Sequence, residues 1–256
     1  MLADGVSLGG FVRARLTGRD AMGLFPMPFT LQVWNLSEED YLALVSAKVL
    51  SIRNGDSVLA SGSVSDTCRR TVAEGTITEV VFSAGLRLWE ASVSLSVESG
   101  VSVSETVRRI LSASGTGIRL LFFPRPDPVR IRGQAFCGRA AECIEEALSA
   151  AGARGYLTEA GLCIAPAEGL PVSMELSADD LLDEPVAVGD GLLLLRTRVT
   201  GWLLGKQVSV KWEGGSAEGL IVERSVDADT AEGNWQCELL PIFLTNGFTD
   251  KLEFEC

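Results

Sequence analysis

Residues 216–242 read SAEGLIVERSVDADTAEGNWQCELLPI. Two runs in this stretch, GLIVERSV and NWQCELL, alternate with a period of two, which is typical of β-strands. In the second run Trp235, Cys237 and Leu239 share one face, and the residues between them share the other. The acidic sequence DADTAEG, residues 227–233, separates the two runs. The pattern therefore predicts a β-hairpin with this sequence as its polar connector.

The acidic connector also allows a second interpretation, a calcium-binding loop. Such a loop needs oxygen ligands at alternate positions, glycine at the sixth and glutamate at the twelfth. Counted from Asp227, Asp229 and Glu238 fit the third and twelfth positions, whereas Ala231 and Glu232 occupy the fifth and sixth. Strands rather than helices flank the loop. The connector is the favoured interpretation, and no metal-binding residue is predicted.

The composition is ordinary for a soluble globular protein, with 46% hydrophobic and 22% charged residues in a chain of 256. No apolar run reaches the ~18–20 residues of a membrane-spanning helix. The first ten residues, MLADGVSLGG, lack a cationic segment followed by an apolar core, so no signal peptide is expected. We expect a soluble protein made in the cytoplasm.

The sequence contains no histidine. This excludes the commonest general base, the Ser–His and Cys–His nucleophile pairs, and most catalytic zinc sites. Chemistry based on two carboxylates stays possible, but the 34 acidic residues form no recognisable motif. We therefore predict that the protein is not an enzyme, with no catalytic residue, no cofactor-binding residue and no cofactor.

The formal net charge is −12, which disfavours ordinary binding to DNA or RNA. The stretch from Arg108 to Gly133 is locally rich in arginine and includes two aromatic residues, Phe122 and Phe123. It could bind a small anion, but a solvated face or a contact between subunits is the favoured interpretation.

The six cysteines are spread over the whole chain, and no pair has the two-residue spacing of a zinc or redox motif. They are Cys68, Cys137, Cys143, Cys163, Cys237 and Cys256. We expect buried free thiols that act as small hydrophobic groups, although disulfide formation by a few of them stays open.

Strand-like runs fill the first hundred residues. They span residues 11–18, 29–34, 47–55, 57–64, 76–85 and 91–98. The pair Asn54-Gly55 is typical of a tight hairpin turn. A short helix interrupts the strands in NLSEEDYLALV, where Ser37 is the expected N-cap.

The pattern changes after Gly100. Ser102 and Glu105 predict a capping box for a helix that ends at Gly115, and a proline-rich segment follows it. A stronger helix is predicted over 138–152, with Ala141, Ile144 and Leu148 on its buried face and Gly152 as its C-cap. Residues 154–166 predict a hairpin that turns at Glu159-Ala160-Gly161, and strand patterning returns from about Met174.

The predicted order is therefore β-rich, α+β, β-rich, in three parts: residues 1–98, 99–175 and 176–256. The fold class is α+β and β-dominated. Periodicity and composition alone indicate a soluble assembly protein or binding module.

Three stretches resemble the tail or baseplate hub proteins of contractile and long-tailed bacteriophages and of related injection machines. The first is FTLQVWNLSEEDYLAL with the hairpin VLSIRNGDSVLASGSVS after it. The second is ESGVSVSETVRRILSASG with GQAFCGRAAECIEEALSAAGARGYLTEAGLCIA. The third is VTGWLLGKQVSVKWEGGSAEGLIVERSVDADTAEGNWQCELL. Together they cover most of residues 10–245, and their order and spacing carry the resemblance.

The resemblance implies two tube-like β-barrels, residues 1–98 and 176–256, that flank the small α+β domain 99–175. It implies a homotrimeric ring that joins the sixfold tail tube to a threefold spike and lines the DNA channel. The expected partners are tail tube or distal tail proteins, a tail spike or tip protein, and DNA only in passage. The protein is expected in the virion tail after assembly in the host cytoplasm, without stable membrane association. The acids of DADTAEG are then expected to face solvent, the lumen or a neighbour.

Two other functions stay open at this point. A monomeric carbohydrate- or cell-surface-binding β module would also be rich in strands. A tail-associated glycan hydrolase would need a cleft with two carboxylates at catalytic separation. The hub interpretation alone requires a threefold ring.

Overall fold

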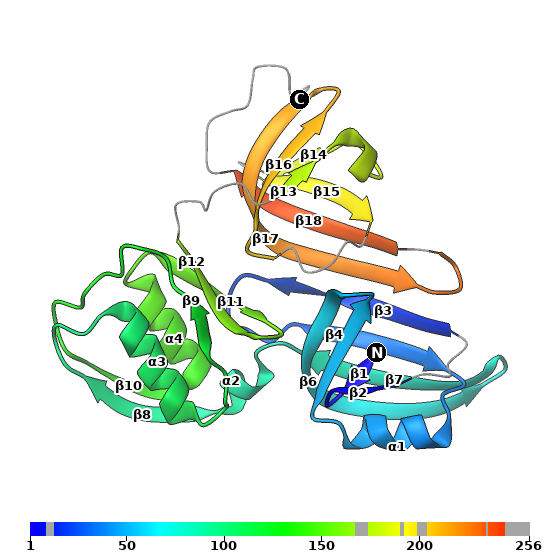
Figure 1. The fold of residues 1–256 in the computed structure, drawn as a ribbon, viewed down its shortest axis with the longest axis horizontal. Helices are drawn as coiled ribbons and strands as arrows, with labels where there is room; N and C mark the ends of the chain where they lie inside the picture. Colours follow the sequence, from blue (N-terminus) through cyan, green and yellow to red (C-terminus); the bar gives the residue numbers. More distant parts are fainter. Residues whose placement is uncertain (9–12, 167–173, 190–191, 199–203, 234, 244–256) are drawn as a thin grey trace.

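The computed structural model describes residues 1–8, 13–166, 174–189, 192–198, 204–233 and 235–243. The fold is α+β and dominated by strands, which confirms the predicted fold class. Figure 1 shows a strand-rich region that contains both the first and the last described residues, beside a smaller unit that contains α3 and α4.

One large sheet contains most of the described strands. Its strands are β1 (Leu2–Ala3), β2 (Val6–Ser7), β3 (Arg13–Ala21), β4 (Pro28–Trp34), β5 (Val49–Asn54), β6 (Ser57–Val72), β7 (Gly75–Ser83), β13 (Met174–Leu176), β14 (Val186–Gly189), β15 (Leu192–Arg198), β16 (Gln207–Trp212), β17 (Gly215–Asp229) and β18 (Trp235–Phe243). The main path runs β14-β15-β18-β17-β3-β4-β7-β6-β5-β1-β2, and β16 joins β13 to β17. Strands from the two ends of the sequence therefore lie in the same sheet.

The junction between the two strand-rich segments is the antiparallel pair β3–β17. The two segments were expected to form two β-barrels of similar topology. Their hydrogen bonding is instead continuous from one segment to the other, so the idea of two independent, duplicated units is wrong. The physical reason is the length of β17. Its first part pairs with β16, and its second part extends to cover β3, whose backbone would otherwise form an open sheet edge.

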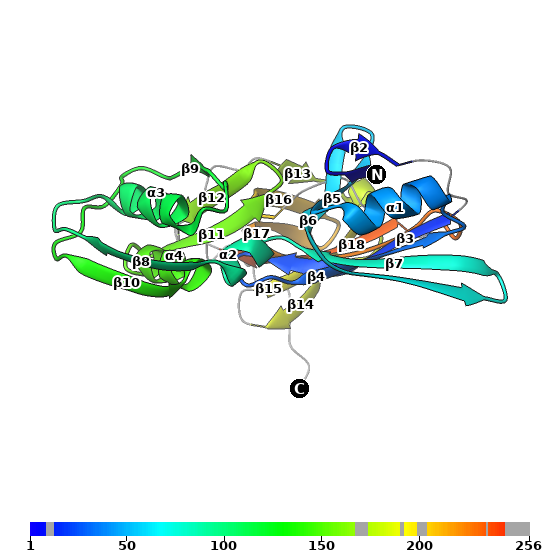
Figure 2. The same cartoon turned by 90° about the horizontal axis from the view of Figure 1, so that it is seen from below.

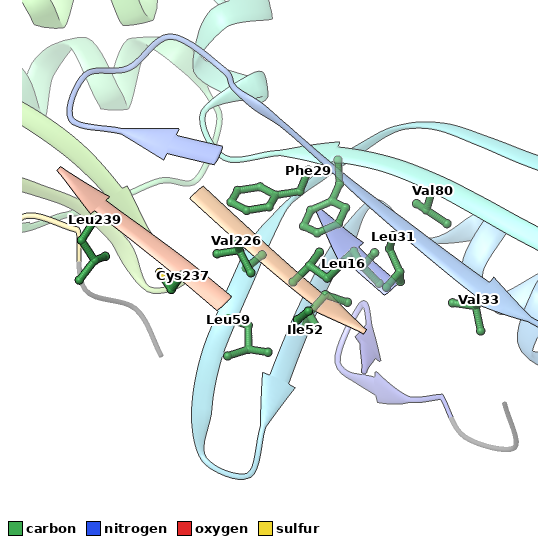
Figure 3. Close-up of a cluster of buried hydrophobic side chains, with 14 of the residues drawn as sticks. Leu16, Phe29, Leu31, Val33, Ile52, Leu59, Val80, Val226, Cys237 and Leu239 are labelled. Carbon is green, nitrogen blue, oxygen red and sulfur yellow. The ribbon is translucent and has the colours of Figure 1, made fainter. Parts of the chain in front are cut away.

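The same two segments share one hydrophobic core. Figure 3 shows Leu16 and Phe29 of the first segment beside Val226 of the last. Leu31 and Leu239 belong to the same cluster. These side chains are buried, and they come from strands on both sides of the junction. Burial of apolar surface shared by both segments, together with the backbone pairing, holds the segments as one unit.

The smaller unit, called the middle unit below, has two small sheets and three helices. Its elements are α2 (Leu86–Glu90), β8 (Ser92–Val97), α3 (Val103–Ser114), β9 (Leu120–Phe122), β10 (Gln134–Arg139), α4 (Ala140–Ser149), β11 (Ala153–Thr158) and β12 (Gly161–Pro166). Strand β8 pairs with β10, and β12 lies between β9 and β11. A second hydrophobic core, separate from the first, fills this unit.

The strand β8 was expected in the first strand-rich segment, yet it pairs with β10 and its Val93 and Val97 belong to the second core. Helix α2 also contributes Leu88 to that core. We therefore propose that the first segment ends near residue 84 rather than at 98. Sequence periodicity identifies a strand but does not identify the sheet that it joins.

The helices agree with their sequence signals. Ser37 caps α1 (Glu38–Ser46), and its hydroxyl accepts a hydrogen bond from the backbone N–H of Asp40. Ser102 caps α3 in the same way through the N–H of Glu105, and Gly115 ends this helix in the left-handed conformation that glycine adopts without strain. Helix α4 buries Ala141, Ile144 and Leu148 as expected, but its C-cap is Ala150 rather than Gly152.

The predicted hairpins are present. Asn54 and Ser57 pair around the turn that contains Gly55, whose φ of 56° is positive. Strands β11 and β12 turn at Glu159-Ala160, and β17 and β18 form the hairpin of the opening stretch. The hairpin of β6 and β7 extends well beyond the strands around it (Figure 2).

The cysteines only partly match the expectation of burial. Cys143 and Cys237 are buried and Cys163 is half-buried, but Cys68 and Cys137 are exposed. Cys137 lies on the outer face of β10, where alternation places Phe136 inward and its neighbour outward. Burial raises the pKa of Cys237 to about 12. Cys256 lies outside the described residues. Among the helices that the structure describes, none is long and apolar enough to cross a membrane.

Candidate assembly site at the seam between strands β3 and β17

The seam is defined here as strand β3 together with residues 223–229 of β17. The register pairs Ala21 with Glu223 at one end and Arg15 with Asp229 at the other. Strands more than 200 positions apart in the sequence meet here. Because this contact decides how the two strand-rich segments sit together, its side chains are the candidate site for assembly.

A buried ion pair occupies one end of the seam. Arg224 donates to both carboxylate oxygens of Asp20, from Nε at 3.0 Å and from Nη2 at 2.9 Å. The two residues are direct cross-strand partners, and the Arg224 side chain is 0% exposed. The guanidinium carbon also lies 6.0 Å from the centre of the Phe29 ring. Two parallel charge-assisted hydrogen bonds fix both the distance and the orientation of the two groups.

Burial raises the pKa of Asp20, and the charge and hydrogen bonds of Arg224 oppose this shift. Desolvation of both charges offsets much of their attraction, so such a pair adds little net stability compared with apolar residues of the same size. Loss of one partner is different, because it leaves an uncompensated charge in the core. The pair therefore selects this register and disfavours any other pairing of the two strands.

A second cluster of charges occupies the other end of the seam. The Arg13 guanidinium bonds the Asp229 carboxylate, with Nε 3.2 Å from both oxygens, and its Nη2 also contacts Glu232 at 2.8 Å. The same guanidinium lies 4.5 Å from the centre of the Trp34 ring, a cation–π geometry. Asp229 is buried and accepts hydrogen bonds from the N–H groups of Ala231 and Glu232. The hydrogen bond from Arg13 lowers the pKa of Asp229.

Two more ion pairs link the two strands. Arg15 Nη2 is 3.0 Å from Asp227, and Arg19 is 3.8 Å from Glu223. In three of the four pairs β3 supplies the arginine and β17 the carboxylate, whereas the buried pair reverses this polarity. A register slip would therefore bring like charges together and bury an unpaired one.

The acids of the connector were expected to face solvent, the lumen or a neighbour. For Asp229 this is wrong, because its carboxylate is buried against Arg13. For Asp227 and Glu232 the partners are arginines of β3 in the same chain. These contacts were not predictable from the local sequence, because a strand far away in the sequence supplies each of the arginines. The arginine at position 224 was the available signal, since it shares the alternating face of the buried Val226 and Ala228.

In the ranges that the structure describes, no group of three or more His, Cys, Asp or Glu side chains could hold a metal ion. The arginine-rich stretch lies in the middle unit. Arg109 bonds Glu98 at 2.9 Å and Glu105 at 3.2 Å, and Arg108 lies 3.7 Å from Glu105. These two arginines therefore have partners in their own chain.

No protein-family model and no curated protein matches the sequence. Solved structures do match. The tail protein from Neisseria meningitidis MC58 aligns with 92% of this chain and 94% of its own, at 11% identity and a TM-score of 0.70. A prophage MuSo2 43 kDa tail protein from Shewanella oneidensis aligns with 92% and 93%, at 13% identity and a TM-score of 0.64.

A third similar structure is the Escherichia coli c3393 protein, a component of the type VI secretion system with structural similarity to the T4 bacteriophage tail proteins gp27 and gp5. It aligns with 93% of this chain and 75% of its own, at 12% identity and a TM-score of 0.67. The resemblance inferred from sequence motifs is thus confirmed at the level of the fold. This chain has the fold of phage tail proteins and of a related type VI secretion component.

Proposed function

We propose that this chain is a structural hub protein of a phage-type tail baseplate or a related injection machine. Three copies form a ring that joins the sixfold tail tube to a threefold spike and lines the DNA channel. The observation that carries the proposal is the single sheet joined through the seam, in a fold shared with a tail protein over more than nine-tenths of both chains.

In such a ring the joining of the two strand-rich segments keeps the two β units of each copy in register with the tail tube. Each copy presents two tube-like β units, fused along the seam, and the middle unit lies beside them. Three copies supply six such units to the tail tube above and three chains to the spike below. A ring of this kind works only if the two units of each copy keep a fixed relative position, and the cross-strand ion pairs of the seam fix that position.

The acidity of the chain suits passage of DNA. A net charge of −12 per copy, concentrated in a narrow channel, repels a phosphate backbone instead of retaining it. The role is structural and non-catalytic. The partners are tail tube or distal tail proteins on one side and a spike or tip protein on the other. The location is the virion tail, after assembly in the host cytoplasm and without stable membrane association.

Light scattering of the purified protein tests the proposal. We expect a mass of three times 27.2 kDa, because the ring needs three copies. A monomer with measurable glycan affinity would contradict the proposal and support the carbohydrate- or cell-surface-binding module. Turnover of purified cell-wall glycan would instead support the hydrolase.

A further inference from the structure

The outer face of helix α1 combines apolar and acidic side chains in the open. Leu42 is 59% exposed and Val45 is 48% exposed, although both are large hydrophobic residues. Glu38 and Glu39 lie exposed at the start of the helix, and spacings of three and four residues place all four side chains on one face. Arg69 bonds Glu38, whereas Glu39 has no ion pair among the described residues. This face is called the α1 face below.

The middle unit carries an exposed surface of the opposite charge. The strap, defined as residues 121–132, begins within β9 and leads to β10. It contains Val129, which is 59% exposed, and Ile131, which is 92% exposed. A 92% exposed isoleucine is unusual for a single chain, and a group of exposed apolar side chains marks an interaction surface.

The strap is held in place by the rest of the middle unit. Backbone hydrogen bonds join Val103 to Pro128, Gly100 to Arg130, and Arg130 to Val101, at 2.8 to 2.9 Å. The carboxylate of Asp127 accepts from the N–H of Ser104 at the start of α3. The strap therefore presents a preformed surface, and a partner that binds it has little ordering entropy to overcome.

The extended backbone of the strap sorts its side chains into two sets. Arg130 turns inward, with its guanidinium 5.3 Å from the centre of the Phe136 ring. Its neighbours Val129 and Ile131 are consequently outward, since side chains alternate along an extended chain. Arg125 and Arg132 are exposed and form no ion pair within the described ranges.

The two surfaces are complementary in charge as well as in apolar character. The strap holds three arginines against one aspartate, a formal charge of +2, and Arg125 and Arg132 are its exposed cations. Residues 36–46 hold three acids and no base, a formal charge of −3. In a chain with a net charge of −12, a free basic surface is best matched by an acidic surface of another copy.

We propose that the α1 face of one copy docks onto the strap of the next copy. Helix α1 and the middle unit lie toward opposite ends of the molecule in both views (Figures 1 and 2), so the two surfaces do not meet within one chain. A contact between two different surfaces is head-to-tail. Such a contact produces a closed ring when the rotation that relates successive copies brings the last copy back to the first, and an open filament when it does not. The closure into a ring of three rests on the proposed function, whereas the contact itself does not.

Two substitutions remove the contact from opposite sides. Leu42→Asp places a charge in the apolar part of the α1 face, and Ile131→Asp does the same on the strap. Each is expected to raise the concentration needed for assembly about tenfold or more, since a tenfold change needs only ~1.4 kcal/mol per contact. Leu182→Asp, at another exposed leucine, is the matched control and should assemble as the wild type. All three variants should keep the wild-type circular dichroism spectrum, because the replaced side chains are exposed in the single chain.

A mixture of the two defective variants distinguishes a head-to-tail contact from other contacts. The Leu42→Asp variant keeps its strap, and the Ile131→Asp variant keeps its α1 face. One intact contact can therefore form between them, and we expect a 1:1 heterodimer by light scattering but no larger assembly. A charge swap gives a second test. Glu39→Arg alone and Arg132→Glu alone should each weaken assembly, and both changes combined in one chain should restore it.

The outcomes separate this inference from the proposed function. A wild-type trimer whose mass is unchanged in both Asp variants would overturn the docking contact and leave the ring in place. Monomeric variants together with a wild-type dimer or filament would support the contact and contradict the threefold ring. Loss of assembly in both variants without heterodimer formation on mixing would also overturn the contact, as would a wild-type protein that stays monomeric.

Discussion

The ion pair between Asp20 and Arg224 joins the two ends of the sequence at one point of the sheet. Both residues are buried, and both carboxylate oxygens are engaged. We expect Asp20→Ala to lower the free energy of unfolding by about 3–5 kcal/mol, because the guanidinium would stay in the core without its counter-charge. Urea unfolding followed by tryptophan fluorescence measures this change.

The matched control replaces both partners at once. The double variant Asp20→Leu/Arg224→Met should unfold at a free energy within about 1 kcal/mol of the wild type, or higher, since two apolar side chains of similar size remove the desolvation penalty. A single variant that is as stable as the wild type would show that water reaches Arg224.

The lowered pKa of Asp229 predicts a loss of stability in acid. A carboxyl group whose pKa is lower in the folded state stabilises the protein above its unfolded pKa, about 3.9 for aspartate, and loses this contribution as the pH falls through the folded value. Glu159 acts in the same direction, since the hydrogen bond from Arg53 lowers its pKa. Burial raises the pKa of Asp20, and this works in the opposite direction.

We therefore expect the free energy of unfolding to fall between pH 5 and pH 3, and to fall less in the variant Asp229→Asn/Glu159→Gln. Urea titrations at both pH values measure the difference. Glu218→Gln, an exposed glutamate on the same strand as Asp229, should leave the pH dependence of the wild type unchanged. An equal fall in the free energy of unfolding between pH 5 and pH 3 in the wild type and the double variant would contradict the roles given to Asp229 and Glu159.

The individual contacts of the seam were not predictable from the sequence. The period of two placed Trp235, Cys237 and Leu239 on one face, but it could not show that Arg13 and Asp229 meet. Such pairing depends on the register between distant strands, and the local sequence does not contain it. An arginine on an otherwise apolar face was the only local sign of the buried pair.

At the scale of elements, short sequence motifs predicted helix caps and turns better than they predicted the contacts of the seam. The caps at Ser37 and Ser102 and the turn at Asn54-Gly55 were predicted correctly, because each depends on neighbouring residues. The assignment of strand β8 to the first segment was wrong, since its partner β10 follows about forty residues later. Local chemistry thus predicts elements well and their partners poorly.

Helix α4 provides a test at this scale. Leu148 is 1% exposed and belongs to the core of the middle unit. Leu148→Asp should lower the free energy of unfolding by about 3–5 kcal/mol, because it buries a charge without a partner. Leu148→Met keeps the volume and should lower it by less than about 1.5 kcal/mol. Melting of the Asp variant at the wild-type temperature would show that this face is not packed as described.

At the scale of the whole molecule, the order of β-rich, α+β and β-rich parts was predicted correctly, whereas the separation of the two β-rich parts was not. The return of strand patterning suggested two independent units. The structure instead has one sheet and one core that both segments share. Periodicity along a chain does not report which sheet edges are joined, and the fusion at β3 and β17 was for this reason not predictable.

The acidity of the chain predicts weak interaction with DNA. We expect no binding of double-stranded DNA at 150 mM salt in a fluorescence anisotropy titration, because the net charge of −12 repels the phosphates. The strap variant Arg125→Gln/Arg132→Gln should behave as the wild type does. Tight binding that weakens steeply with salt would mean that an arginine-rich surface faces the channel.

The symmetry of the assembled particle is the most direct test of the hub proposal. Averaged electron micrographs of the purified protein, or of isolated tails that contain it, are expected to show a closed ring of three copies. Its inner wall should contain six similar strand-rich units around an open channel. A ring with another number of copies, or an assembly without a central channel, would contradict the proposal that this chain adapts a sixfold tube to a threefold spike.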